Sequence, residues 1–229
     1  MVTHVGGNMK VLYEDNHIIV VDKEPNVPIQ KDSSNDEDLL TIIKRYLKEK
    51  YNKQGNVFLG LVQRLDRPVS GVCVFAKTSK AASRLSDAIR KNEIEKEYLA
   101  VIDGNIIKDE DTYIDYLVKD TKTNMVKVSN KGKKSILSYK LLKRSNNMSL
   151  VKVFLKTGRP HQIRVQFSSR NYPIYADHRY NPNSKSKEQI ALHSYKISFK
   201  HPTTKELLCF TSVPNRKPFN NFDINSFLK

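Results

Sequence analysis

The stretch Gln63–Ala76 reads QRLDRPVSGVCVFA, a charged loop that runs directly into an apolar segment. Pro68 biases Arg67 towards an extended backbone, and Gly71 permits a tight approach to a neighbouring segment, so the first half is a shaped loop. The second half, Val72–Ala76, is short and entirely apolar, which is typical of a buried strand. The stretch therefore predicts a sheet with an interior strand that begins at this loop.

Outward from this stretch, strand patterns dominate and helical patterns are few. We expect strands over 10–13, 17–22, 98–102, in several runs between 113 and 155, and over 195–199 and 207–210. We expect helices over 36–52, from Ser79 as a cap, and from Gly158-Arg159-Pro160, where proline suits a first turn. These patterns indicate the α+β class. We expect a single catalytic domain over 10–214 around a mainly antiparallel sheet, with a flexible N-terminal tail over 1–9 and a C-terminal tail over 215–229.

The charge of the chain points to its partner. Its 229 residues contain 40 Lys and Arg against 24 Asp and Glu, a net charge of +16. Such an excess repels itself and indicates a polyanionic partner, although a basic surface without a dedicated role is the alternative. The basic residues are scattered along the chain instead of lying on one amphipathic helix, which disfavours a membrane surface. Nucleic acid is the favoured partner.

Several other functional classes lack support. No apolar run approaches the ~20 residues that span a bilayer, and the start MVTHVGGNMK has no secretory pattern. The two cysteines, Cys73 and Cys209, lie in apolar runs and predict buried reduced thiols in a cytoplasmic protein. The six histidines show no zinc spacing, and no glycine-rich phosphate loop occurs. We expect no metal site and no cofactor.

Four segments in order carry a family resemblance. They are EDNHIIVVDK (Glu14–Lys23), RLD (Arg64–Asp66), KEYLA (Lys96–Ala100) and TGRPHQIRVQ (Thr157–Gln166). Their order and their residues resemble those of the RluA-type pseudouridine synthases. The resemblance extends from about residue 11 to residue 214. By itself Asp66 would more readily be a salt-bridge or turn residue than a catalyst. The set of segments changes that balance.

The resemblance implies a fold and a set of site residues. The family folds around a long bent, largely antiparallel sheet with peripheral helices and a central active-site cleft. Asp66 is implied to be the essential catalyst, and Arg164 its ion-pair partner. Tyr98 is implied to stack on the target uracil and to serve in proton removal from C5, and Arg64 to help push the target base out of its stack. The family uses neither metal nor cofactor.

The residue types suit this chemistry. Pseudouridine formation breaks the glycosidic bond, turns the uracil and joins C5 to C1′, and a carboxylate can either attack C1′ or remove the C2′ proton. Both roles remain open for Asp66. A paired arginine keeps the carboxylate ionised. Flipping a base forfeits stacking, which Arg64 and Tyr98 could partly restore. We expect RNA contacts from the residues Arg64, Arg67, Lys77, Arg159 and His161.

Two departures from the family pattern are visible. Gln63 stands where the family usually has histidine, and Ala176 where it usually has a glycine before an aspartate. The leading hypothesis is an isomerase that acts on uridines in structured RNA, either ribosomal or transfer RNA, as a monomer without an obligatory protein partner. The alternatives are a catalytically inactive RNA-binding relative and, more distantly, a metal-dependent nuclease.

Overall fold

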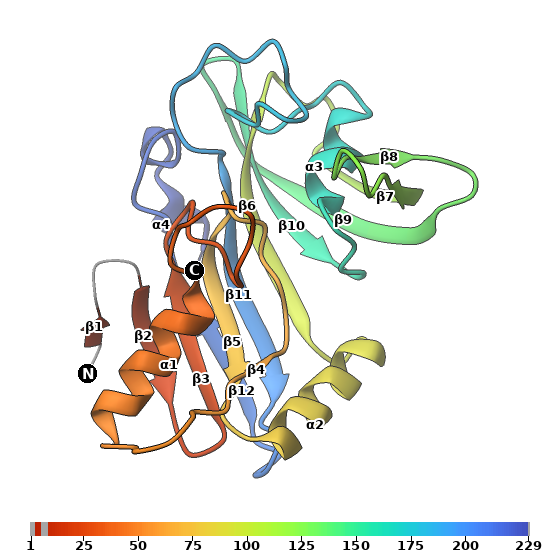
Figure 1. Cartoon of the computed structure of the whole chain (residues 1–229). Helices are drawn as coiled ribbons and strands as arrows, with labels where there is room; N and C mark the ends of the chain where they lie inside the picture. Colours follow the sequence, from red (N-terminus) through yellow and green to blue (C-terminus); the bar gives the residue numbers. More distant parts are fainter. Residues whose placement is uncertain (1–2, 6–8, 229) are drawn as a thin grey trace. The chain divides into compact units, whose positions relative to one another are not determined.

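The computed structural model describes residues 3–5 and 9–228, which form two compact units (Figure 1). The first unit comprises 1–94 and 196–212, and the second comprises 95–195 and 213–229. Neither unit is continuous in sequence. The strand β11 (Leu192–Lys200) contributes its first residues to the second unit and its last five to the first.

The first unit is a sheet with two helices. Its elements are β1 (Thr3–Val5), β2 (Met9–Glu14), β3 (Ile18–Lys23), α1 (Leu39–Lys50), β4 (Gly60–Leu61), β5 (Ser70–Ala76), α2 (Ser79–Arg90), the end of β11 and β12 (Leu207–Thr211). The strand order is β1-β2-β3-β5-β11, with β4 beside β5 and β12 beside β11. All seven residues of β5 are buried, as expected for an interior strand.

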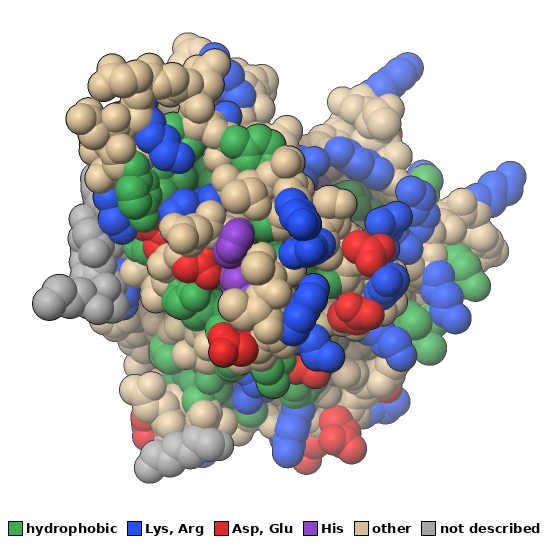
Figure 2. All heavy atoms as spheres, turned by 90° about the horizontal axis from the view of Figure 1, so that it is seen from below, with side chains coloured by type: hydrophobic (Ala, Val, Ile, Leu, Met, Phe, Trp, Pro, Cys, Tyr) green, Lys and Arg blue, Asp and Glu red, His purple; other side chains and the backbone are tan. Residues whose placement is uncertain are grey.

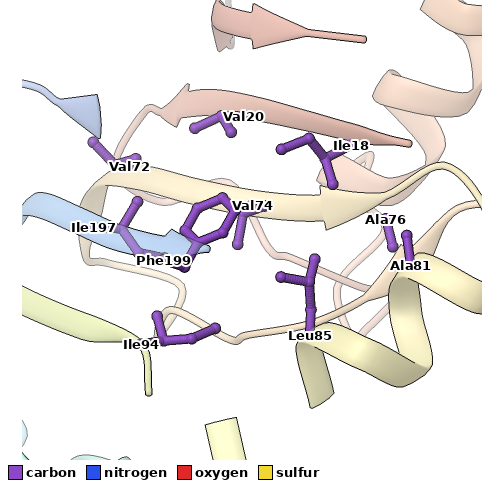
Figure 3. Packing of buried hydrophobic residues seen from close by; sticks show 10 residues of the cluster. All are labelled: Ile18, Val20, Val72, Val74, Ala76, Ala81, Leu85, Ile94, Ile197 and Phe199. Carbon is purple, nitrogen blue, oxygen red and sulfur yellow. The ribbon is translucent and has the colours of Figure 1, made fainter. Parts of the chain in front are cut away.

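Both faces of this sheet are covered. Figure 3 shows the packing on one face, where Ala81 and Leu85 of α2 lie with Ile18 of β3, Val74 of β5 and Phe199 of β11. The opposite side chains of β3 and β5 are also buried, and α1 runs along β2 and β3 (Figure 1). The helix α1 buries four aliphatic side chains along one stripe, as its apolar spacing predicts.

The second unit is a longer antiparallel sheet with one short helix against it. Its elements are β6 (Glu95–Asp103), β7 (Glu110–Lys119), β8 (Val126–Val128), β9 (Lys133–Ser145), β10 (Met148–Leu155), α3 (Gln162–Ser168), the start of β11, a 3₁₀ turn (Phe219–Asn221) and α4 (Ile224–Phe227). The strand order is β11-β6-β10-β9-β7-β8. Phe167 of α3 packs its ring 5.2 Å from Tyr113 and 5.4 Å from Tyr139, measured between centroids, which fixes α3 on one face of the sheet.

The α+β class and the mainly antiparallel sheet are confirmed. The segment expected to be a C-terminal tail instead buries Phe219, Phe222 and Ile224, so its apolar residues hold it in place. The expected tail over 1–9 lies partly outside the described residues, but Thr3–Val5 pairs with β2. No helix in the described part of the chain is long and apolar enough to cross a membrane.

Three local predictions need correction. The cap of α2 is Thr78, one residue earlier than expected, because its side chain accepts a hydrogen bond from the Ala81 amide. The helix α3 begins at Gln162 and not at the Gly158-Arg159-Pro160 turn, because His161 adopts a left-handed backbone with φ of 52°. Cys209 is exposed, since alternate residues of β12 face outwards; Cys73 is buried as expected.

Candidate active site

The loop that contains Asp66 is held in place by contacts within the first unit. Leu65 and Val69 are buried on either side of the half-buried Asp66, and the Asp66 carbonyl accepts a hydrogen bond of 2.9 Å from the Val69 amide. Gly71, the second residue of β5, has a φ of 112°, a left-handed backbone that favours glycine. These contacts fix the conformation of the loop. Asp66 is the first residue of the turn that this hydrogen bond closes.

A buried ammonium group, which the sequence did not single out, supports this loop. Lys23 at the end of β3 is 1% exposed, and its Nζ donates hydrogen bonds of 2.9 Å to the carbonyls of Glu24, Val27 and Arg67. Burial lowers the pKa of Lys23 to about 8, and the nearby negative charge of Asp66 opposes that shift. Lys23 therefore ties the segment after β3 to the Asp66 loop.

Gln63, the departure from the family pattern, has a structural partner. Its side-chain amide donates to the carbonyl of Val72 at 3.2 Å, which joins the residue before the RLD triplet to β5. Glutamine can make this bond without carrying a charge.

Two of the expected RNA-contacting residues of the first unit are engaged in ion pairs. Arg67 donates to Ser34 at 2.7 Å and pairs with Asp32 and Asp36, which ties the loop before α1 to the Asp66 loop. Lys77 is largely buried, and its Nζ lies 2.7 Å from Glu14 Oε1. Both have a structural role in this conformation, and their contact with RNA stays a prediction. Arg64, by contrast, presents an exposed side chain.

Glu14 is the centre of the cluster that holds Lys77. It accepts hydrogen bonds from Lys50, Tyr46 and Tyr51, at the end of α1, and from Lys77, directly after β5. Four side chains thus meet at one buried carboxylate. Burial alone would raise the pKa of Glu14, but the bonds from Lys50 and Lys77 lower it to about 2.

We expect Glu14→Gln to lower the free energy of unfolding at pH 7 by about 3 kcal/mol, because the lysines lose their counter-charge while remaining partly buried. Since the folded pKa lies below the unfolded value, the stabilisation from Glu14 is complete above about pH 4.5 and is lost as the pH falls towards 2. Urea titrations at several pH values test this. Glu37→Gln, which alters the exposed Arg45 pair, is the matched control and should change stability little.

Arg164 is the best-defined charged group of the second unit. It lies buried on α3, and its Nε and Nη2 donate to Asp177 Oδ2 at 2.8 Å and Oδ1 at 2.6 Å. The Asp177 carboxylate is also buried. This bidentate pair fixes the plane of the guanidinium. The role of Asp177 was missed, because nothing in the sequence joins it to Arg164 across a turn.

Ala176 precedes Asp177 with φ of 58°. This left-handed backbone explains why glycine is usual there in the family that the sequence resembles. The departure leaves the turn in place, and Asp177 still reaches Arg164.

Tyr180 links the remaining groups around Arg164. Its ring lies under the guanidinium, 5.1 Å from centroid to Cζ, and its hydroxyl lies 2.7 Å from His161 Nδ1. The same hydroxyl accepts a hydrogen bond of 3.0 Å from the Val126 amide, so it can donate its own proton to the imidazole. His161 would then carry its proton on Nε2. Tyr180 thus sets the positions of two residues that the sequence nominated.

The other nominated residues of the second unit are Tyr98 and Arg159. Tyr98 is buried on β6 and lies opposite Val153 of β10, on the face of the sheet that carries α3. Arg159 is exposed and donates through Nε to the carbonyl of Lys134 at 3.2 Å. Asp66 and Arg64 belong to the first unit, and Tyr98 and Arg164 to the second. The pairing of Asp66 with Arg164 stays a prediction.

The surface carries the expected basic character. In the view of Figure 2, Lys and Arg side chains are spread widely and Asp and Glu side chains are fewer, in line with the net charge of +16. Within residues 3–5 and 9–228, no three His, Cys, Asp or Glu side chains cluster in a way that could hold a metal ion.

Known proteins are similar to this chain in sequence and in fold. The model of the RNA pseudouridylate synthase family matches residues 17–169. The chain is 30% identical to the ribosomal large subunit pseudouridine synthase C of Buchnera aphidicola subsp. Baizongia pistaciae, over 90% of this chain and 67% of that protein. It is 31% identical to the uncharacterized RNA pseudouridine synthase YjbO of Bacillus subtilis, over 88% of this chain and 71% of that protein.

Among solved structures, the human RNA pseudouridylate synthase domain containing 4 superposes with a TM-score of 0.76 at 19% identity, over 90% of this chain and 88% of that one. That similarity shows a shared fold. The sequence match extends across the Asp66 loop, Tyr98 and Arg164. The chain therefore belongs to the RNA pseudouridylate synthase family, and its activity is the isomerisation of uridine to pseudouridine in RNA.

Proposed function

We propose that this enzyme modifies uridines of large-subunit ribosomal RNA, with Asp66 as its catalytic carboxylate. The assignment of roles rests on two buried charged residues, one that holds the loop bearing Asp66 and one that holds the guanidinium of Arg164. Lys23 fastens the loop that presents Asp66, and Asp177 holds the guanidinium of Arg164. Groups fixed in this way lose little orientational freedom when substrate binds, which is what an electrostatically assisted reaction requires.

We assign the steps of the reaction to these residues. Asp66 either attacks C1′ of the target nucleotide or removes the C2′ proton, and the bond between N1 and C1′ breaks in both cases. The uracil turns and C5 joins C1′; in the first route the bond between Asp66 and C1′ breaks, and in the second Asp66 returns the proton to C2′. The C5 proton then leaves, and N1 of the product carries a proton. Tyr98 stacks on the uracil and serves in removing the C5 proton. Arg164 keeps the Asp66 carboxylate ionised and directed at the sugar. The residues of the chain supply all of these roles without a metal or cofactor.

The choice of ribosomal RNA rests on the relatives, several of which are named as ribosomal large subunit pseudouridine synthases. We expect the enzyme to act in the cytoplasm, as a monomer. Mapping pseudouridines in total cellular RNA with and without the gene tests the substrate. Loss of one or a few sites in large-subunit RNA supports the proposal, and loss confined to transfer RNA contradicts it.

Arg64 has an exposed side chain beside Asp66 and suits the expulsion of the target base. We expect Arg64→Ala to slow single-turnover isomerisation in a stem-loop about tenfold more than in a short unpaired RNA, because only the stem-loop must be unstacked. Arg90→Ala, at an exposed surface ion pair on α2, is the control. Equal losses on the two RNAs would reject the role of Arg64 in unstacking.

RNA binding should depend strongly on salt and should not depend on divalent metal. With a net charge of +16 the enzyme is expected to contact several phosphates, each contributing a slope of about 0.7–0.9 to the plot of log K against log salt. Fluorescence anisotropy between 50 and 300 mM salt, about a sixfold range, measures the slope. A slope near zero, or loss of turnover in EDTA, contradicts the proposal.

A further inference from the structure

One face of the second unit's sheet presents aromatic and aliphatic side chains outwards. Side chains alternate along each strand, so Tyr98, Val153 and Tyr139, which lie in register, share the face covered by α3. Phe154 therefore points to the opposite face, where it is 39% exposed. On β7 the same alternation turns Ile114 and Tyr116 outwards.

The pairing of β7, β9 and β10 places these side chains on neighbouring strands of the same face. Ile114 of β7 lies opposite Ile136 of β9, Tyr116 lies opposite Lys134, and Phe154 of β10 lies opposite Ser138 of β9. Ile114 is 55% exposed and Tyr116 is 46% exposed. We call this surface the outer face of β7, β9 and β10. The exposed part of this face does not extend to β6, where Leu99 is buried.

Lysines surround this apolar centre. Lys134 and Lys140 project from β9 on the same face and are exposed, and Lys127 of β8 lies opposite Val118. Two acidic side chains lie in the same rows, Glu110 opposite Lys140 and Glu97 opposite Phe154. Lys152 is partly neutralised, because it lies 3.8 Å from Glu97. The net charge of the outer face is therefore positive.

We infer that the outer face of β7, β9 and β10 binds an unpaired segment of the RNA substrate, apart from the nucleotide that is modified. This inference rests on the proposed function. Exposed aromatic rings on a sheet are platforms on which bases stack, and flanking lysines contact the phosphates. A second copy of the chain fits less well, because a two-fold contact would bring the lysines of both copies together.

Further lysines lie at the edge of this sheet. The strand β8 ends the strand order, and the turns on either side of it carry the exposed residues Lys122 and Lys131. These lysines extend the positive charge of the outer face to the edge of the sheet. The outer face thus adds affinity and substrate selection without touching the reacting atoms.

The experiment measures binding of a fluorescein-labelled 12-nucleotide oligouridylate by anisotropy. Lys134→Glu/Lys140→Glu is expected to raise Kd at least tenfold, and Tyr116→Ala at least fivefold. The matched controls lie in the first unit. Lys44→Glu/Lys48→Glu changes the charge equally on the exposed side of α1, and Phe58→Ala removes an aromatic ring that is 49% exposed. The controls are expected to change Kd less than twofold.

Equal effects of the outer-face variants and their controls overturn the inference. It is also overturned if sedimentation shows a wild-type dimer that Tyr116→Ala dissociates while Kd for the oligouridylate is unchanged. Single-turnover isomerisation of a saturating minimal stem-loop should be retained by all four variants. If the wild-type enzyme isomerises no RNA, the proposed function fails and the binding result still stands; if turnover is normal but the outer-face variants bind normally, only this inference fails.

Discussion

Asp66→Asn is expected to abolish pseudouridine formation, lowering the single-turnover rate by at least about 10⁴-fold. Asparagine nearly matches aspartate in shape, so the loop between Leu65 and Val69 should keep its form. It can neither attack C1′ as an anion nor accept the C2′ proton, and the two open mechanisms predict the same loss. Tritium release from RNA labelled at uracil C5 measures the rate, because that proton leaves only when the new bond has formed.

The affinity for RNA separates loss of chemistry from loss of binding. Kd for a stem-loop substrate should stay within about threefold, since phosphate contacts dominate affinity. Asp36→Asn is the control, because it removes a carboxylate that pairs with Arg67 near the same loop without taking part in the reaction. Substantial turnover by Asp66→Asn would remove the basis of the mechanism.

Removal of the Arg164 guanidinium should lower turnover about 10²- to 10³-fold on structured and unstructured RNA alike, because the defect lies in the chemical step. Arg164→Met tests this, and Arg164→Lys should recover part of the rate by supplying charge without the planar fork. Asp177→Asn should also lower turnover, by loosening the guanidinium. Both Arg164→Met and Asp177→Asn leave a buried charge unpaired, at a cost of about 3–5 kcal/mol of stability.

A double variant distinguishes catalysis from stability. Arg164→Met/Asp177→Leu replaces both charges with apolar side chains, so we expect its melting temperature to return close to that of the wild type. Its turnover should remain as low as that of Arg164→Met. If turnover recovers along with the melting temperature, Arg164 serves only the fold and its assignment as the partner of Asp66 is wrong.

Much of the fold follows from local patterns in the sequence. The apolar run after Gly71 became the buried strand β5, and the spacing of Leu39, Ile43 and Leu47 became the buried side of α1. The start of α3 was predicted wrongly because a single backbone angle determines it. A left-handed His161 delays the start of α3, and the apolar spacing of that segment contains no sign of it. The packing of the last residues was missed because Phe219 and Ile224 are too few to form a period.

For the site, the family motifs nominated the reacting groups but not what holds them. Lys23 and Asp177 are ordinary charged residues in sequence, and each gains its role through a contact that folding creates. Conversely, Lys77 looks like a free cation, yet the structure pairs it with Glu14, 63 positions earlier. Sequence motifs identify the reacting residues, whereas the ion-pair and hydrogen-bond partners that lie far away in the chain are identified only from the structure.

The discontinuity of the first unit has a consequence for how the protein is made. During translation, β5 emerges long before Lys196–Lys200 of β11, its neighbour in the sheet, because the whole span 95–195 lies between them. Lys196 lies 120 residues after the end of β5, so at about 5–20 residues per second the delay is about 6–24 s. Throughout that interval the nascent chain exposes an edge of its most apolar strand that β4 pairs only at Phe75 and Ala76, and the rest is a template for pairing with other chains. Shielding of this edge by chaperones at the ribosome therefore matters for the yield of active enzyme.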